Sequence, residues 1–169
     1  PGTGLREVGV VSGCVIKYNI TGSTNPGGGI YNATTISNSV FFGNDCGTGA
    51  GVYDLVDGVD IFNCLFVGNF ARSAGGAIRM NGGTIRNCTV VGNMGYTGGG
   101  LYVDTSTIVS NCIVWNNSDD IIGQDDNKVV YSIISDGDGD STCTNSDPLL
   151  VGGYFLDDGS PAIDAGAGT

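Results

Sequence analysis

The sequence predicts an all-β chain folded as a right-handed parallel β-helix, a solenoid of about five to six rungs with a C-terminal cap. Three observations predict this fold: a nine-residue segment that recurs at a fixed spacing, a second short segment between its copies, and asparagines at constant places in the repeat. A period of 20 to 50 residues is typical of stacked structural repeats. We expect the rungs to span residues 1–134, and a loop with the capping segment of the same domain to span residues 135–169.

The first repeated segment alternates apolar positions in the manner of a β-strand. Its copies are offset by 25, 25, 24 and 24 residues. Short strands cannot bury a face alone, so the copies are expected to stack at about 4.8 Å per rung. Stacking predicts three inward columns, formed by Val11, Ile36, Ile61, Ile85 and Val109; by Cys14, Ser39, Cys64, Cys88 and Cys112; and by Ile16, Phe41, Phe66, Val90 and Val114.

The second segment places glycine or alanine before an apolar residue. Its copies predict a fourth inward column of Ile30, Val52, Ile78 and Leu101. Asparagine flanks the first segment on both sides, and it tolerates the left-handed backbone that a tight corner requires. Stacked amides can also bond from rung to rung. We therefore expect corners at Asn38, Asn63, Asn87 and Asn111, and again at Asn19, Asn44, Asn69, Asn93 and Asn117.

Composition restricts the classes of partner. The chain has six basic and 17 acidic residues, a net charge of −11, so it lacks a basic patch that would neutralise a phosphate backbone. It also lacks the 18 consecutive apolar residues that indicate a membrane-spanning helix. We expect neither a nucleic-acid partner nor insertion into a membrane.

Two resemblances add to this interpretation. Gly28-Gly-Ile-Tyr31 followed by Phe41-Phe-Gly-Asn44 resembles the repeat of polymorphic outer-membrane proteins, which form β-helices. Residues 108–166 are similar to the choice-of-anchor Q domain of bacterial surface proteins, through Asn111-Cys-Ile-Val-Trp-Asn116, Tyr131-Ser-Ile-Ile134, Asp147-Pro-Leu-Leu150 and Ser160-Pro-Ala-Ile-Asp-Ala-Gly166. The resemblance implies an extracellular or bacterial cell-surface location, with the last of these elements closing the β-helix.

The six cysteines do not require disulfides. Cys64, Cys88 and Cys112 repeat on one inward column, where parallel Cβ vectors leave the Cβ atoms farther apart than the ~3.8 Å of a disulfide. We expect buried free thiols there. Cys46 and Cys143 lie off the column, and a bond between them, a bond to another chain and two free thiols all remain open.

A short acidic run suggests one metal site. Asp136, Asp138 and Asp140 alternate with glycine, a spacing that suits oxygen coordination of calcium. The glycine and glutamate of an EF-hand are absent from the sixth and twelfth positions, and a solvated turn is the alternative. We expect either no cofactor or calcium at these three residues.

The sequence offers no clear set of catalytic residues. It contains no histidine, and its aspartates fall mostly in loops and in the cap, whereas glycoside hydrolysis needs carboxylates at a set separation. We expect a protein that is not an enzyme. The alternative is a carbohydrate-active lyase or hydrolase, with Arg79 as the base beside Asp54, Asp57, Asp60 and Asp104.

Two outward surfaces are candidates for binding. The first is a candidate glycan-binding stripe, one residue beyond the fourth column, where stacked rings would offer sugars a flat platform. The alternative is that tyrosine merely suits a half-exposed strand. The stripe consists of Tyr31, Tyr53, Arg79 and Tyr102.

The second surface is an apolar outer strand face. Exposed apolar patches mark interfaces unless another part of the chain covers them. Residues 118–128 or the segment Leu149–Ile163 would provide such a cover; packing of another copy would instead give a filament. We expect a structural or adhesive function, with other copies, cell-surface components or glycans as partners. The candidate assembly face consists of Val40, Phe42, Leu65, Val67, Val91, Ile113 and Trp115.

Overall fold

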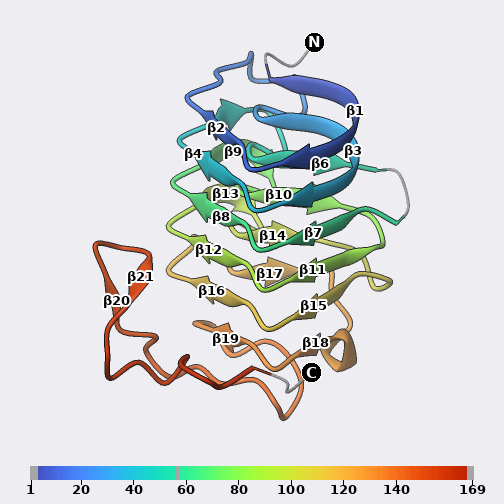
Figure 1. Cartoon of the computed structure of the whole chain (residues 1–169). Helices are drawn as coiled ribbons and strands as arrows, with labels where there is room; N and C mark the ends of the chain where they lie inside the picture. Colours follow the sequence, from blue (N-terminus) through green and yellow to red (C-terminus); the bar gives the residue numbers. More distant parts are fainter. Residues whose placement is uncertain (1–3, 56–57, 167–169) are drawn as a thin grey trace.

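A computed structural model, which describes residues 4–55 and 58–166, shows stacked coils that form a parallel β-helix (Figure 1). The predicted all-β solenoid is confirmed. The described residues contain no α-helix, only a 3-10 turn, η1 (Asp126–Lys128), and no helix among them is long and apolar enough to cross a membrane. Strands pair in parallel throughout the coils, and the antiparallel pair is a C-terminal hairpin of β20 (Leu150–Val151) and β21 (Phe155–Leu156).

Three parallel sheets run along the solenoid. The first has ten strands and forms two faces, because β3 pairs with strands of both: β1 (Leu5–Ser12), β3 (Ile30–Ser37), β6 (Val52–Asp54), β7 (Asp60–Phe62), β10 (Ile78–Met80), β11 (Thr84–Arg86), β14 (Leu101–Tyr102), β15 (Ile108–Ser110), β17 (Ile121–Ile122) and β18 (Val129–Val130). The second, the six-stranded sheet, contains β2 (Val15–Lys17), β4 (Val40–Phe42), β8 (Leu65–Val67), β12 (Thr89–Val91), β16 (Ile113–Trp115) and β19 (Ile133–Ile134). The third contains β5 (Asp45–Cys46), β9 (Phe70–Ala74) and β13 (Met94–Thr97).

The predicted inward columns form the core. Phe41 pairs in register with Phe66, and their fully buried rings stack with centroids 4.5 Å apart. The structure also adds a member to each column beyond the copies found in the sequence, because the last rung is offset by only 20 residues. These added members are Ile121, Val129, Ser132 and Ile134.

The buried asparagines form the most regular polar feature of the fold. Asn44 Nδ2 donates to Asn69 Oδ1 at 2.8 Å, and Asn69 Nδ2 donates to Asn93 Oδ1 at 2.9 Å. Each oxygen also accepts the backbone N–H of the preceding rung's asparagine, as from Asn44 N at 3.0 Å. The ladder runs from Asn19 through Asn117 and ends on Asp120, whose Oδ1 accepts from Asn117 Nδ2 at 2.9 Å. Rung-to-rung amide bonding at these positions is confirmed.

The left-handed corners are confirmed at one end of the strand and shifted by one residue at the other. Asn38, Asn63, Asn87 and Asn111 have φ of 49°, 53°, 53° and 52°. At the far end, the positive φ belongs to the residue before each ladder asparagine, because the asparagine side chain must turn into the core. Those residues are Tyr18, Gly43, Gly68, Gly92 and Asn116.

The cysteines of the column are free thiols. Cys46 and Cys143 are free thiols as well, which is one of the three alternatives that the sequence left open. Each thiol of the column donates to the carbonyl two residues earlier, as Cys64 Sγ does to Phe62 O at 3.2 Å. Ser39 Oγ makes the same bond to Ser37 O at 2.6 Å. Cysteine and serine are therefore equivalent here because both are small donors to one carbonyl. Burial raises the pKa of Cys88 well above its ordinary value.

The last rung is closed by residues 135–144. Thr144 N donates to Ser132 O at 3.0 Å, and Thr144 O accepts from Ile134 N at 2.9 Å, so the stacking continues past β19. Beyond it, Ser160 is buried and its Oγ donates to Pro148 O at 2.7 Å. A Cβ on Gly166 would lie 3.4 Å from the Asn111 side chain, which places the C-terminal segment against the last asparagine corner.

We expect Asn69→Ala to lower the free energy of unfolding by about 3 kcal/mol, because it leaves buried partners on two rungs without hydrogen bonds at ~1–3 kcal/mol each. Asn63→Gly is the control. Glycine accepts the positive φ of Asn63 without strain, so the change should stay within about 0.5 kcal/mol. Urea unfolding followed by circular dichroism measures the free energy of unfolding of both variants. An equal decrease in the two variants would contradict the prediction that the buried asparagine ladder stabilises the fold.

We also expect the thiols of Cys64, Cys88 and Cys112 to be unreactive toward DTNB in the folded protein. Their side chains are buried, with exposed fractions of 3%, 2% and 2%, so the reagent has almost no access to the sulfur atoms. Cys14 and Cys143 are half-buried and should account for the fast reaction. All six thiols should titrate in denaturant without a reductant; a smaller number would reveal a disulfide.

Candidate functional site

The predicted stripe forms a continuous stack on the outside of the solenoid. Tyr31 and Tyr53 stack with ring centroids 5.3 Å apart and planes 17° apart. The Arg79 guanidinium carbon lies 5.8 Å from the Tyr53 centroid and 4.9 Å from that of Tyr102. Arg6 extends the stack, 4.2 Å from the Tyr31 centroid. The stripe residues are half-buried, so each presents an edge or a face to solvent.

A column of glycines beside the stripe makes this stacking possible. A Cβ on Gly49 would lie 2.7 Å from the Cβ of Tyr53, and one on Gly75 would lie 2.8 Å from the Cβ of Arg79. Both glycines have positive φ, of 62° and 66°. The same residue type stands four positions before every member of the predicted stripe, at Gly27, Gly49, Gly75 and Gly98. Sequence reasoning missed this column, although its spacing was visible.

Arg79 does not lie in a cluster of acids. Its Nη1 contacts Thr48 Oγ1 at 3.3 Å, and its Nε is buried without a hydrogen-bond partner. Asp54 is fully buried and accepts the backbone N–H of Ala33 at 2.7 Å. Of the other acids that we considered with Arg79, Asp57 lies outside the described residues.

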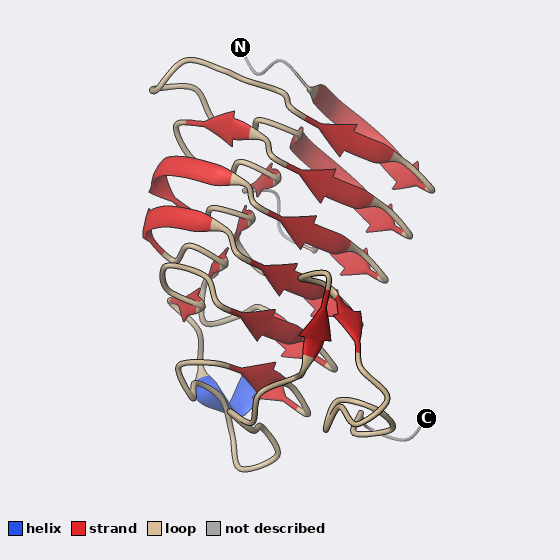
Figure 2. Cartoon of the chain, turned by 90° about the vertical axis from the view of Figure 1, so that its left-hand side faces the viewer, coloured by secondary structure: helices blue, strands red, loops and turns tan. Residues whose placement is uncertain are grey.

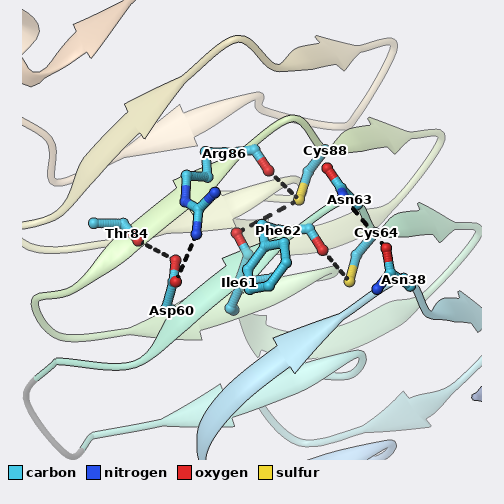
Figure 3. Close-up of polar contacts among 9 residues, drawn as sticks. All are labelled: Asn38, Asp60, Ile61, Phe62, Asn63, Cys64, Thr84, Arg86 and Cys88. Atoms are coloured by element: carbon cyan, nitrogen blue, oxygen red, sulfur yellow. Dashed lines mark hydrogen bonds and ion pairs between the residues drawn. The ribbon is translucent and has the colours of Figure 1, made fainter. Parts of the chain in front are cut away.

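Asp60 is held by other groups (Figure 3). Its carboxylate accepts from Arg86 Nη2 at 2.8 Å and from Thr84 Oγ1. Burial acts to raise the pKa of Asp60, but these hydrogen bonds outweigh burial and lower it. Arg86 also lies over the Phe62 ring, 4.3 Å from its centroid. The pair braces neighbouring rungs on the outside of the solenoid.

Asp104 organises a turn. One of its oxygens accepts from Gly82 N at 2.9 Å, from Ser106 N at 3.0 Å and from Thr107 Oγ1 at 3.0 Å. Burial alone would raise its pKa, yet these bonds and one from Ser106 Oγ lower the pKa to about 2. The carboxylate is therefore held by hydrogen bonds from backbone N–H and hydroxyl groups.

The acidic run does not assemble as a metal centre within the described residues, where no group of three or more acidic, cysteine or histidine side chains is placed to hold an ion. Asp136 accepts from Asp120 N at 3.1 Å and Asp140 from Thr142 N at 2.9 Å. Burial, followed by nearby acids, raises the pKa of Asp138. Calcium binding at Asp136, Asp138 and Asp140 stays a prediction.

The predicted apolar face is the outside of the six-stranded sheet. The inward alternates, such as Phe41, are fully buried, whereas Phe42 is 36% exposed. The prediction was wrong for Val91, which was placed on this outer face but is buried. The hairpin β20–β21 lies over this side of the solenoid (Figure 2). Tyr154 and Phe155, at its tip, line a groove of about 500 Å³ together with Val15, Lys17, Tyr18, Val40, Phe42, Leu65 and Val67. The C-terminal segment Leu149–Ile163, which was expected as a cover, thus lies over part of the apolar face through its hairpin and leaves this groove between them.

No protein-family model, curated protein or solved structure significantly matches this chain. The two resemblances noted in the sequence therefore stay predictions.

We expect Asp104→Ala to cost about 1 kcal/mol, the usual effect of removing a side chain that accepts from backbone N–H groups. The pKa of Asp104 is lowered on folding from 3.8 to about 2, so its stabilisation is complete above pH 4. It disappears as pH falls toward 2. Unfolding measured between pH 2 and pH 7 should show the variant's deficit shrinking over that window; a deficit independent of pH would contradict this assignment.

Proposed function

We propose that this protein is an extracellular or cell-surface β-helix module that is not an enzyme and that has a structural or adhesive role. The observation that carries the adhesive role is the stack of Tyr31, Tyr53, Arg79 and Tyr102. Tyr31 and Tyr53 stack face to face with centroids 5.3 Å apart, so the stack presents a rigid row of ring edges to solvent. A solenoid repeats this contact from rung to rung, which suits an extended chain ligand.

The arginines add polar recognition to this stack. Arg6 and Arg79 lie over tyrosine rings, and their guanidinium groups add N–H donors to the stack. The ligand class is therefore an extended polysaccharide that lies along the ring edges and presents hydroxyl or carboxylate oxygens to the arginines.

The proposal that the protein is not an enzyme is supported by the hydrogen bonds of the aspartates that were considered with Arg79. Asp60 is paired with Arg86, and Asp104 holds a turn. Neither is positioned as a partner of Arg79, the base in the lyase alternative. A surface location is supported by the resemblance of residues 108–166 to choice-of-anchor Q domains.

The proposed function does not include assembly into filaments. The hairpin already lies against part of the outer face through which copies would pack, including the groove wall of Val40, Phe42, Leu65 and Val67. Electron microscopy of concentrated protein tests this point, since ordered fibres would require the remaining half-buried part of the face, at Ile113 and Trp115, to mediate assembly.

We expect Tyr53→Ala to reduce polysaccharide binding about tenfold, which corresponds to ~1.4 kcal/mol, because it removes the central ring of the stack and one contact of Arg79. Tyr96→Ala is the matched control, since Tyr96 is 88% exposed and lies off the stripe. Affinity gel electrophoresis against neutral and acidic polysaccharides measures both. Equal retardation of the two variants, or none for the unmodified protein, would contradict the adhesive role.

A further inference from the structure

The groove beneath the C-terminal hairpin has the composition of a ligand site. Its volume of about 500 Å³ lies within the ~300–1,000 Å³ of small-molecule pockets. One wall is the outer face of β2, β4 and β8, and the other is formed by Tyr154 and Phe155 at the hairpin tip. The groove is independent of the tyrosine stripe, because it lies on a different sheet.

The two walls do not fill the space between them. Phe155 is 65% exposed and Tyr18 is 61% exposed, although both line the groove. The hairpin is braced internally, by Asp157 N donating to Leu149 O at 3.0 Å, and the rings of Tyr154 and Phe155 contact each other with centroids 4.7 Å apart. An occupant would therefore remove apolar surface from water on both walls without displacing the hairpin.

The charge of the groove is the reverse of the charge of the chain. The net charge of the protein is −11, yet the residues that line the groove include Lys17 and no carboxylate. Lys17 forms no ion pair with any described residue. Its ammonium group lies 5.9 Å from the Tyr18 ring centroid, and Tyr18 meets Phe42 edge to face at 5.5 Å. An apolar groove with a single unpaired cation at one end selects an apolar ligand with one negative group.

We propose that this groove binds an amphiphile with one anionic head group, of the class of medium-chain carboxylates. The carboxylate lies beside Lys17, and the hydrocarbon chain lies between Phe42 on the sheet and Phe155 on the hairpin. Burial of the chain supplies most of the affinity, and Lys17 fixes its orientation. The head group of a lipid and a free fatty acid share this chemistry, and the experiment separates them.

Isothermal titration calorimetry with decanoate, below its micellar concentration, tests the proposal. We expect one site per chain and an affinity that rises by about fourfold for each methylene from octanoate to decanoate, as for buried CH₂ groups. Decanol, which lacks the charge, should bind more weakly. Sedimentation with vesicles that contain an anionic phospholipid should leave the protein in the supernatant; sedimentation of the protein with the vesicles would assign the site to a membrane lipid and overturn the proposal of a free ligand.

Three variants locate the site. Phe155→Ser should weaken decanoate binding about tenfold, and Lys17→Gln should weaken decanoate while leaving decanol unchanged. Val67→Trp, which fills the groove from the sheet side, should abolish binding even if the hairpin has moved in the first variant. Phe70→Ser is the control, since Phe70 is an exposed aromatic residue on another sheet.

Several results would overturn the proposal. They are absence of saturable decanoate binding to the unmodified protein, equal affinities in Phe70→Ser and Phe155→Ser, and equal loss of decanoate and decanol in Lys17→Gln. A concentration-dependent dimer that excludes decanoate, seen by analytical ultracentrifugation, would show that a second copy fills the groove. Circular dichroism of each variant confirms that the solenoid is intact, so that a loss of binding reports on the groove.

Discussion

The fold depends on one constraint: a buried amide must find its hydrogen-bond partner on the neighbouring rung. Asn44, Asn69 and Asn93 are fully buried, and each uses both its amide hydrogens and its carbonyl oxygen within the core. Unpaired, these groups would cost more than the hydrophobic contacts around them return. The amide bonds therefore hold the rungs in register. The aliphatic and aromatic columns specify the same register, because a slip of one residue would turn their buried side chains to the outside.

The same constraint explains which parts of the sequence were predictive. A stacked structure repeats its environment at each rung, so a residue type that recurs at a fixed offset reports directly on its position in three dimensions. The inward columns and the left-handed corners at Asn38, Asn63 and Asn87 were predictable for this reason. The sixth rung was harder to find because its offset falls to 20 residues, and because serine replaces cysteine at Ser132. That replacement preserves the hydrogen bond but not the sequence pattern.

The surfaces were less predictable than the core. Sequence placed Tyr31, Tyr53, Arg79 and Tyr102 on one line, but their stacking also requires the glycine column beside them. The position of the hairpin had no periodic signal at all, since it occurs once and contacts the solenoid through few residues. A groove between a repeated element and a single element is invisible to self-comparison. The acidic run had a regular spacing too, but among the described residues its three carboxylates do not form a group placed to hold a metal ion.

The asparagine ladder also has a direction. Each amide donates one hydrogen bond toward the C-terminal end of the ladder and another to a backbone carbonyl earlier in the chain, as Asn69 does to Phe41 O. The last acceptor of the ladder is Asp120, a buried carboxylate that also accepts from Ser135 N at 2.7 Å. An aspartate side chain has no amide hydrogen to donate to a further rung. The asparagine ladder therefore ends at Asp120. Gene duplication could lengthen the protein by whole rungs anywhere before this residue, since each new asparagine both receives and passes on its hydrogen bonds, whereas growth beyond it would require a new ladder to be initiated.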